Sequence, residues 1–316
     1  MIRSIAMKWL VDSSRVAVLA GGTALICAGC NTQEVGVNLT VPVLMTASRS
    51  FRTESDIELA RAAIPAQLKT LDGLLEVAPR NKDLLHLLAQ SYLEYAFGFL
   101  DDELESLPPG HKDSIERQVL AQRATVFYDR SVQYSLRALD TADPHFSDSF
   151  QKGAPAIEAA AAKLKKESAP GLLFAGMALA SAINVNQGDP SRLVDLPRAI
   201  ALLKASHALD PDYYNGGAAT TLGQIYSSQP KSSGGDPKQA KKWFDEGIAK
   251  SQGKFLLGRV QLARAYAVSI KDRALFEKTL KGVLDEKPDV LPEYRLANEL
   301  AKRRAARYLA QAKELF

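Results

Sequence analysis

The chain has 316 residues, of which 46% are hydrophobic, 24% charged and 7% aromatic. This is the composition of a folded globular protein, and it excludes a chain that is collagen-like or disordered throughout. The formal net charge of +4 is small and evenly spread, which argues against nucleic-acid binding. Only two cysteines occur, Cys27 and Cys30, so the body of the protein has neither a disulfide framework nor a cysteine-based metal site.

Residues 1–30 have the pattern of a secretory signal. A basic segment that ends at Arg15 precedes an apolar run, 16–27, which is too short to span a bilayer. Small residues then precede Cys30, as in the lipobox at which a lipoprotein signal peptidase cleaves, although Cys27 stands where that pattern usually has Leu. We therefore expect residues 1–29 to be removed and Cys30 to be lipidated. An ordinary secretory signal or a short N-terminal anchor is the alternative.

Cleavage before Cys30 would remove three basic residues and Asp12, so the formal charge would fall from +4 to +2 and give no guide to partners. Acyl chains would hold the protein on a membrane surface, because each buried methylene group contributes about 0.8 kcal/mol. Asn31 follows the cysteine in place of the Asp that typically favours retention in the inner membrane. The expected location is therefore the periplasm, with the outer membrane preferred.

The mature chain divides into two parts. Residues 31–52 are rich in Thr, Ser and Val and show no helical period, so the sequence predicts a lipidated tether over 30–52 with a short extended piece at Val35–Val43. No later run alternates with period two between hairpin turns, as a β-sheet would require. The sequence therefore predicts a single all-α domain over 53–316.

Helix starts and stops are easy to place in this domain. Ser55-Asp56 can cap a helix that runs to about Val77, with Pro65 kinking or splitting it. Asn81 can cap the next helix, whose apolar side chains cover nearly every face, so we expect it to be central and buried. Further helices are expected at about 112–139, 154–166 and 171–185.

Two charged segments are expected at the surface. Pro292–Phe316 reads as an amphipathic helix that caps the domain, with Lys302, Arg303 and Arg304 facing water. The inner stripe of that helix would be Ala297, Ala301, Ala305, Tyr308 and Ala312. The acidic run at 101–105 is interpreted as a solvated helix end or, alternatively, as a docking patch for a basic partner.

A helix-pair pattern recurs in the C-terminal half. Leu222-Gly223 and Leu262-Ala263 each stand three residues before an aromatic residue, Tyr226 and Tyr266 respectively. In tetratricopeptide repeats the small residue lets the two helices of a pair approach, and the aromatic ring fills the groove beside them. The sequence thus predicts degenerate tetratricopeptide-like repeats in an α-solenoid or bundle, and a non-repeating α-bundle is the alternative.

Motifs for chemistry are missing. The four histidines, His86, His111, His145 and His207, do not stand at metal-ligand spacing, and no HExxH or GxSxG motif occurs. The sequence also offers no catalytic cysteine after processing. We therefore expect no enzymatic activity, no cofactor and no metal.

Two features favour binding. The central helix carries aromatic residues on more than one face, and a second aromatic face can line a cavity or simply belong to the core. Asn298 lies mid-helix among apolar residues, where it has to hydrogen-bond the backbone or a ligand. The candidates for lining a ligand site or pore are Tyr92, Tyr95, Phe99 and Asn298.

The order and spacing of several stretches resemble one known family, the T component of tripartite ATP-independent periplasmic (TRAP) transporters, or TatT lipoproteins. The stretches that carry the resemblance, within 56–316, are Leu84–Tyr92, Tyr95-Ala96, Leu209–Tyr213, Gly216-Gly217, Leu222-Gly223, Gly234–Asp236, Leu262–Ala267, Leu296–Asn298 and Glu314–Phe316. None is a catalytic signature. The resemblance implies a lipid-anchored periplasmic protein of tetratricopeptide-like helix pairs. It also implies a homotrimer with a cavity or pore through each subunit.

The resemblance further implies association with the periplasmic solute-binding (P) subunit of a TRAP transporter. The role it implies is delivery or exchange of a small ligand, with an apolar molecule as one option. The alternative function is a tetratricopeptide-like lipoprotein scaffold for outer-membrane or cell-wall assembly complexes. A scaffold needs a groove for protein segments and no closed channel.

Overall fold

The computed structural model describes residues 32–108, 114–186, 189–230 and 234–316. Every regular element in these ranges is a helix, which confirms the all-α class. The helices of the N-terminal half are α2 (Thr32–Arg52), α3 (Ile57–Val77), α4 (Lys82–Tyr95), η2 (Ala96–Leu100), α5 (Asp101–Ser106), α6 (Ile115–Asp140), α7 (Phe146–Lys152) and α8 (Ala154–Ala161).

The C-terminal half continues with one further long apolar helix and a series of shorter ones. They are η4 (Lys166–Ser168), α9 (Ala169–Val185), α10 (Pro190–Leu193), α11 (Leu196–Leu209), η5 (Tyr213–Asn215), α12 (Gly217–Ser228), α13 (Pro237–Lys250), α14 (Leu256–Gln261), η7 (Leu262–Ala267), α15 (Arg273–Asp285), η8 (Pro288–Val290), η9 (Pro292–Tyr294), α16 (Arg295–Ala310) and α17 (Ala312–Leu315). Among the elements of both halves, η2 and η7 are π-helical turns, and η4, η5, η8 and η9 are 3₁₀ turns.

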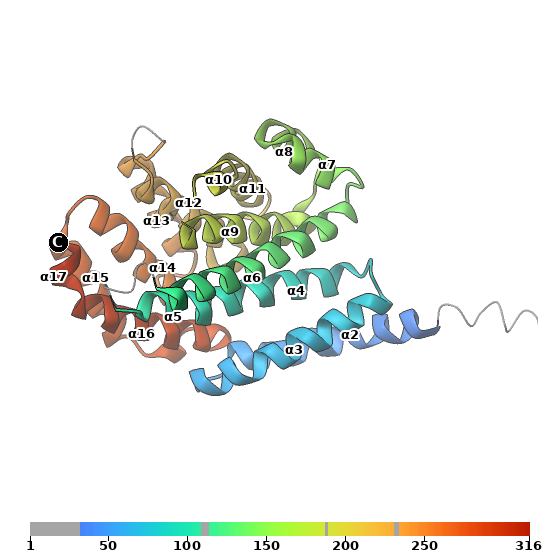
Figure 1. The fold of residues 1–316 in the computed structure, drawn as a ribbon, viewed down its shortest axis with the longest axis horizontal. Coiled ribbons are helices and arrows are strands. Elements are labelled where there is room, and N and C mark those ends of the chain that lie inside the picture. Colours follow the sequence, from blue (N-terminus) through green and yellow to red (C-terminus); the bar gives the residue numbers. More distant parts are fainter. Residues whose placement is uncertain (1–31, 109–113, 187–188, 231–233) are drawn as a thin grey trace, which may run out of the picture.

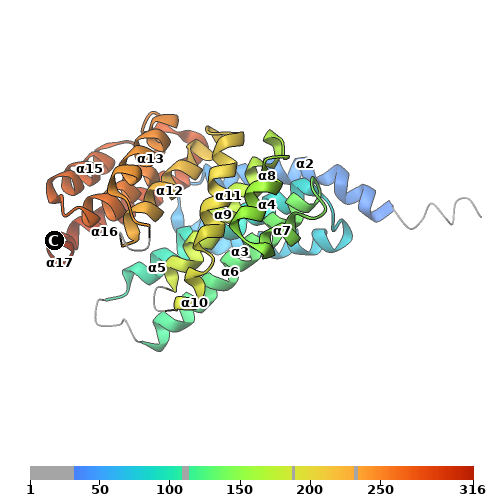
Figure 2. The ribbon, with the colours of Figure 1, turned by 90° about the horizontal axis from the view of Figure 1, so that it is seen from above.

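The helices stack in layers along much of the chain. Helices α2 and α3 form one edge of the molecule, and α4, α6, α9 and α11 follow in contact with one another (Figure 1). The segments from α12 to α17 gather at the other end, so the molecule is elongated when seen from above (Figure 2). Helix α16 returns from that end to pack against α2 and α3. The C-terminal helix therefore closes on the first helices and does not leave an open solenoid end.

The expected helix caps at Asp56 and Asn81 are confirmed. Asp56 Oδ1 accepts hydrogen bonds from the backbone N–H groups of Glu58 and Leu59, and Asn81 Oδ1 accepts one from that of Leu84. Side-chain acceptors at these positions satisfy backbone donors that have no partner in the first turn. Pro65 does not split the helix, because α3 runs unbroken from Ile57 to Val77 and packs through residues on both sides of the proline.

The helix that starts after Asn81 is central, as the sequence predicts. Leu84, Leu88 and Tyr92 of α4 are each at most 1% exposed. Helix α9 lies beside it, and the segment Lys166–Val185 is long and apolar enough to cross a membrane by composition. Most of that segment is buried against α4, α6 and α11, as is usual for the core helix of a folded domain.

Residues 32–52 differ from the expected extended tether. They form helix α2, which packs on α3 and contacts α4 and α16 through one narrow face. Val37 and Val41 are buried on that face, and Leu44 and Phe51 pack beside them. Burial of these side chains outweighs the weak helix propensity of a segment rich in Thr, Ser and Val.

The small residues of the proposed repeats lie at close helix contacts. A Cβ atom on Gly223 would come within 2.8 Å of the Phe244 ring, so only glycine lets α12 and α13 approach this closely. Ala263 is fully buried, and Tyr226 and Tyr266 are half-buried. These contacts agree with the expected packing of helix pairs, while the assignment as tetratricopeptide-like repeats stays a prediction.

Candidate functional site: a central cavity and its polar groups

A cavity of about 440 Å³ lies where the N-terminal and C-terminal halves of the molecule meet. Cavities of this size are typical of sites for small organic ligands. Apolar side chains from many helices line this cavity. Examples from six of them are Ile64 of α3, Leu87 of α4, Phe99 of η2, Ile183 of α9, Leu257 of α14 and Leu300 of α16.

Both π-helical turns found in the described residues contribute to this wall. Phe97, Gly98 and Phe99 come from η2, and Arg264 and Ala265 come from η7. A π-turn inserts one extra residue into a helix and is found frequently at functional sites. Gly98 has little room for a side chain, because its Cβ would lie 3.0 Å from Leu300 Cδ1.

A first polar group in the cavity centres on Glu94 of α4. Its Oε1 atom accepts hydrogen bonds from Gln90 Nε2 at 2.7 Å and from the Tyr214 hydroxyl at 2.9 Å. Burial raises the pKa of Glu94, and these hydrogen bonds and the positive charge of Arg52 oppose that rise. Part of the Glu94 side chain stays accessible because it faces the cavity.

Aromatic rings surround this polar group. The Arg52 guanidinium lies 5.8 Å from the centre of the Tyr294 ring, and the Tyr294 ring meets that of Tyr214 edge-on at 5.7 Å. Phe255 completes the cluster, with its ring centre 5.4 Å from that of Tyr294. All four residues line the cavity. The arrangement can hold a polar group of an otherwise apolar molecule against flat, rigid rings.

A second polar group is Asp101, the first residue of α5. Its side chain lines the cavity and is 6% exposed. Burial raises the pKa of Asp101 to about 7, against the lowering effects of Arg304 and Tyr128. Within the described residues, neither Asp101 Oδ1 nor the Tyr128 hydroxyl makes a hydrogen bond of good geometry. Asp101 Oδ1 is covered by protein, and the Tyr128 hydroxyl and the Arg304 guanidinium are the groups that act on this carboxyl group.

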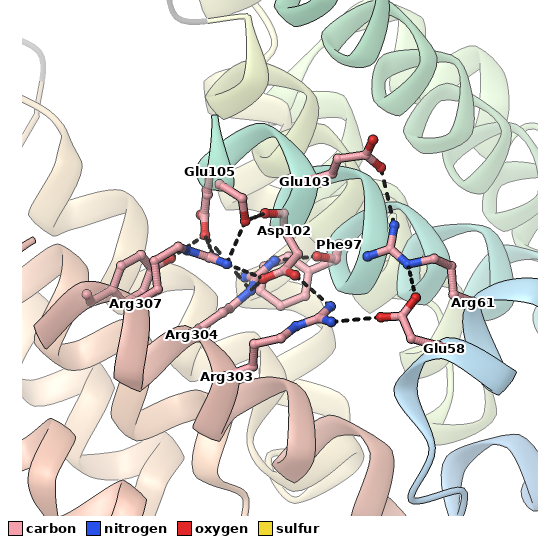
Figure 3. Close-up of polar contacts among 11 residues, drawn as sticks. Glu58, Arg61, Phe97, Asp102, Glu103, Glu105, Arg303, Arg304 and Arg307 are labelled. Carbon is pink, nitrogen blue, oxygen red and sulfur yellow. Dashed lines mark hydrogen bonds and ion pairs between the residues drawn. The ribbon is translucent and has the colours of Figure 1, made fainter. Parts of the chain in front are cut away.

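A dense ion network joins α16 to α5, and its members Glu105 and Arg304 also line the cavity (Figure 3). Asp102 is 3% exposed and pairs with Arg303 Nη2 at 2.6 Å and with Arg307 Nη1 at 2.9 Å. Arg304 is 3% exposed, and its guanidinium lies 3.4 Å from Asp102 Oδ1 and 4.3 Å from the centre of the Phe97 ring. Stacking on an aromatic ring and pairing with a carboxylate compensate for removing the guanidinium from water.

The network extends from α16 to α3. Arg303 Nη1 bonds Glu58 Oε1 at 3.1 Å, and Glu58 also pairs with Arg61, which reaches Glu103 at 3.2 Å. The expectations for both charged segments are therefore wrong in part. Arg304 does not face water, and Asp101 and Asp102 form neither a solvated helix end nor a patch open to a basic partner. The cations that Asp102 meets belong to the last long helix of the same chain.

Phe99 is the residue among the four sequence candidates that lines the cavity. Tyr92 lies outside the wall, where its hydroxyl donates to Asp72 Oδ2 and accepts from Arg130. Tyr95 is also outside the wall and packs between the rings of Phe99 and Phe127, with centres at 5.1 and 5.5 Å. One face of the aromatic helix thus reaches the cavity, and the other belongs to the core.

Asn298 is also outside the cavity wall, and its hydrogen bonds go to the backbone. Its Oδ1 accepts from the backbone N–H of Leu256, and its Nδ2 donates to the carbonyl oxygens of Lys254 and Pro288. These bonds join α16 to the start of α14 and to η8. Of the two partners that the sequence left open for this side chain, backbone or ligand, the structure has the backbone.

The polar residues of the cavity escaped sequence analysis. Glu94 stands in the apolar stretch between Leu84 and Leu100, and a charged residue in such a stretch is the signal that could have pointed to it. Arg52 lies in the segment taken for a tether. Within the described residues, His, Cys, Asp and Glu side chains form no group that could hold a metal ion. The geometry thus defines an all-helical protein with an internal site suited to binding.

Comparison with known proteins identifies the family. Residues 53–316 match the family described as TRAP transporter T-component, and the chain belongs to this family. An uncharacterized protein of Treponema pallidum (strain Nichols) is similar to this chain, with 23% identity over 96% of this chain and 98% of that protein. The T components are accessory proteins of transporters and not a family of enzymes. Membership implies association with a TRAP transporter and a periplasmic or membrane-associated location.

Proposed function

We propose that this chain is a lipid-anchored periplasmic accessory protein that docks the solute-binding (P) subunit of a TRAP transporter and passes a small ligand through its central cavity. The observation that carries the proposal is the cavity itself, which receives residues from elements along the whole chain. Lipidation at Cys30, which lies outside the described residues, and assembly into a homotrimer are parts of the proposal that come from the sequence resemblance.

The lining indicates the kind of ligand. Most of the wall is apolar, which favours a molecule with a substantial hydrocarbon part. Glu94, Arg52 and Asp101 add a few polar groups to this wall, so the ligand has a polar group as well. Of the four sequence candidates, the proposal keeps Phe99 as a lining residue. Glu94, Arg52 and Asp101 take the places of Tyr92, Tyr95 and Asn298.

Filling the cavity tests ligand binding directly. Ala265 and Ala297 are small, half-buried and part of the wall, so Ala265→Trp and Ala297→Trp place an indole ring in the space that a ligand needs. Ala159→Trp, on an exposed position of α8, is the matched control. Each variant is purified from its own cells, and small molecules released on denaturation are identified by mass spectrometry. A molecule that is present in the control and lost in both cavity variants supports the proposal.

Docking of the P subunit is tested separately. The native lipoprotein is crosslinked in its own cells, and proteins that co-purify with it are identified by mass spectrometry. A periplasmic solute-binding protein among the main partners supports the transporter role, and the two cavity variants should retain it. Assembly machinery or cell-wall enzymes in its place would support the alternative role as a tetratricopeptide-like scaffold and contradict the proposal.

A further inference from the structure

Helix α2 exposes an uncharged apolar face. Val35, Leu39 and Val43 are 52%, 75% and 66% exposed, and they follow one another at intervals of four residues. An α-helix turns about 100° per residue, so these three side chains form one stripe along roughly 12 Å of the helix. The other exposed residues near this stripe are also uncharged: Thr32, Pro42 and Thr46.

The charges of α2 lie away from this stripe. Glu34 is half-buried toward the inner face, Arg52 lines the cavity, and Arg49 is exposed in the last turn. Exposed faces of other helices carry charges, as at Lys241 and Asp245 of α13, and the exposed Ile115 and Val119 of α6 lie on a helix whose exposed residues include Glu116 and Arg123. An uncharged face over three turns is therefore unusual on this molecule and calls for an apolar environment.

The stripe is held firmly in place. The opposite face of α2 is buried at Val37 and Val41. Two side-chain hydrogen bonds fasten the helix further, from Gln67 Nε2 to Ser48 Oγ at 2.7 Å and from Asn81 Nδ2 to Asn38 Oδ1 at 2.7 Å. Helix α2 therefore cannot roll to bury its apolar stripe without breaking these contacts. What covers the stripe has to come from outside the described part of the chain.

We propose that this stripe rests on the lipid bilayer and fixes the orientation of the protein on the membrane. The proposal builds on lipidation at Cys30, which lies only two residues before Thr32. Two residues span at most about 7 Å, so acyl chains on Cys30 would bring the first turn of α2 to the membrane surface. An amphipathic helix that lies along such a surface places its apolar side chains at the boundary of headgroups and acyl chains.

This orientation places the cavity next to the membrane. Ser48, Phe51 and Arg52, at the C-terminal end of α2, line the cavity from the side opposite the stripe. Helix α2 thus separates the bilayer from the cavity. Three apolar side chains are too few to hold a protein of this size on a membrane alone. They are enough to select which face turns to the membrane once acyl chains provide the attachment.

Single labels on α2 test the proposal. After cleavage and acylation the mature chain has no free thiol, so Leu39→Cys and Val43→Cys each introduce one reactive cysteine. The control is Lys278→Cys, at an exposed position of α15. Each variant receives an environment-sensitive fluorophore and is reconstituted on vesicles of phosphatidylethanolamine and phosphatidylglycerol. Brominated lipids then report contact with the acyl region by quenching.

The labels at positions 39 and 43 are expected to shift to shorter emission wavelengths and to be quenched at least twofold, and the label at 278 to be unaffected. If the labels at 39 and 43 on vesicle-bound protein keep the emission wavelength of a water-exposed label and are quenched no more than the control label, the proposal is overturned. If the emission of these labels shifts to shorter wavelengths without vesicles, and does so more at higher protein concentration, a second copy of the chain covers the stripe. This result also overturns the proposal.

Failure of the anchor is measured apart from failure of the stripe. Mass spectrometry of the native protein shows whether Cys30 carries acyl chains. The same three labels are also measured on a chain from residue 31 attached to nickel-chelating lipids through an N-terminal histidine tag. Quenching at 39 and 43 in this form supports the stripe whatever Cys30 carries. If quenching at 39 and 43 is absent both on the tagged chain and on the acylated chain, the stripe does not contact the membrane, even if Cys30 carries acyl chains.

Discussion

Helices α2 and α16, which lie near opposite ends of the described sequence, use polarity in opposite ways. Helix α16 is rich in arginine, yet Arg304 is 3% exposed and lies among acidic and aromatic side chains from α5 and η2. Helix α2 is poor in charge, yet Leu39 is 75% exposed on its apolar stripe. A buried cation needs anions that the chain itself provides, whereas an exposed apolar stripe needs a partner from outside.

The comparison shows what decides the orientation of a helix. Helix α16 buries a broad face that consists of Leu296, Asn298, Leu300, Ala301, Arg304, Ala305 and Tyr308, whereas α2 buries Val37, Val41 and Ser48. For α16 the distant run 101–105 provides carboxylates, and these make burial of an arginine tolerable. For α2 no counter-charge is needed, because the residues of its exposed apolar stripe are uncharged, and the proposed partner of this stripe is lipid. The predictions below test this contrast, from the largest expected effect to the smallest.

Tyr95→Asp gives the scale for a disrupted core, against which the effects in α16 and α2 can be compared. Tyr95 is 5% exposed and stacks on Phe99 and Phe127, so the substitution deletes a ring and buries a carboxylate. We expect a loss of more than about 4 kcal/mol in the free energy of unfolding, measured by urea denaturation. Tyr95→Phe should cost less than about 1 kcal/mol. A stable Tyr95→Asp protein that loses only its ligand would instead place Tyr95 in the binding site.

Arg304→Ala tests the buried charge of α16. The substitution leaves Asp102 and Glu105 with one cation fewer in a buried place, and we expect a loss of about 3–5 kcal/mol. Arg295→Ala is the matched control, because the Arg295 side chain, at the start of the same helix, is 42% exposed and pairs with Glu299 at 3.7 Å. Its loss should stay near 1 kcal/mol. Equal losses in urea denaturation would mean that burial is not what makes Arg304 important.

A pair of substitutions in α2 separates its two faces. Val41→Asp introduces a charge at a side chain that is 1% exposed, and we expect it to cost about 2–3 kcal/mol and to detach the helix. Leu39→Asp, two residues away on the exposed stripe, should change the free energy of unfolding by less than about 0.5 kcal/mol. Urea denaturation and proteolysis of α2 measure both. Similar effects at the two positions would contradict the described orientation of α2.

Asp101→Asn probes the carboxyl group between the network and the cavity. The pKa of Asp101 is raised to about 7, so the fold binds this proton more tightly than the unfolded chain does. The ionised carboxylate therefore costs stability increasingly as pH rises from about 4 to 7, and the cost stays constant above. We expect the substitution to stabilise by about 1–3 kcal/mol at pH 8 and hardly at pH 4. Asp148→Asn, at an exposed position, should show no such trend in melting temperature.

Much of the fold could be predicted from local signals. The caps at Asp56 and Asn81, the burial of the helix after Asn81 and the close approach at Gly223 follow from residue type and spacing. The family could also be predicted, because order and spacing of short stretches survive where overall identity is low. These features depend mainly on residues that are close to one another in the sequence, so the sequence alone is enough to predict them.

The sequence failed where distant segments meet. It assigned Arg304 to water and residues 30–52 to a tether, since the carboxylates that face Arg304 lie some 200 residues away and the apolar surface of α3, α4 and α16 that receives α2 exists only in the folded chain. It did not single out Glu94, Arg52 or Asp101 as cavity residues for the same reason. Tyr92 and Tyr95 belong to the same helix as the cavity residue Phe99, and only their neighbours show that they point elsewhere.

The sequence by itself thus determined the helical class, the caps, the central helix and the family of this protein. Local propensity, turn residues and apolar periodicity suffice for these, because they act over a few residues. The tertiary structure alone decided which faces of α2 and α16 are buried, how the acidic run is neutralised and which side chains line the cavity. Those outcomes depend on charges and apolar surfaces that come together only when segments some 200 residues apart are in contact, as Arg304 and Asp102 are.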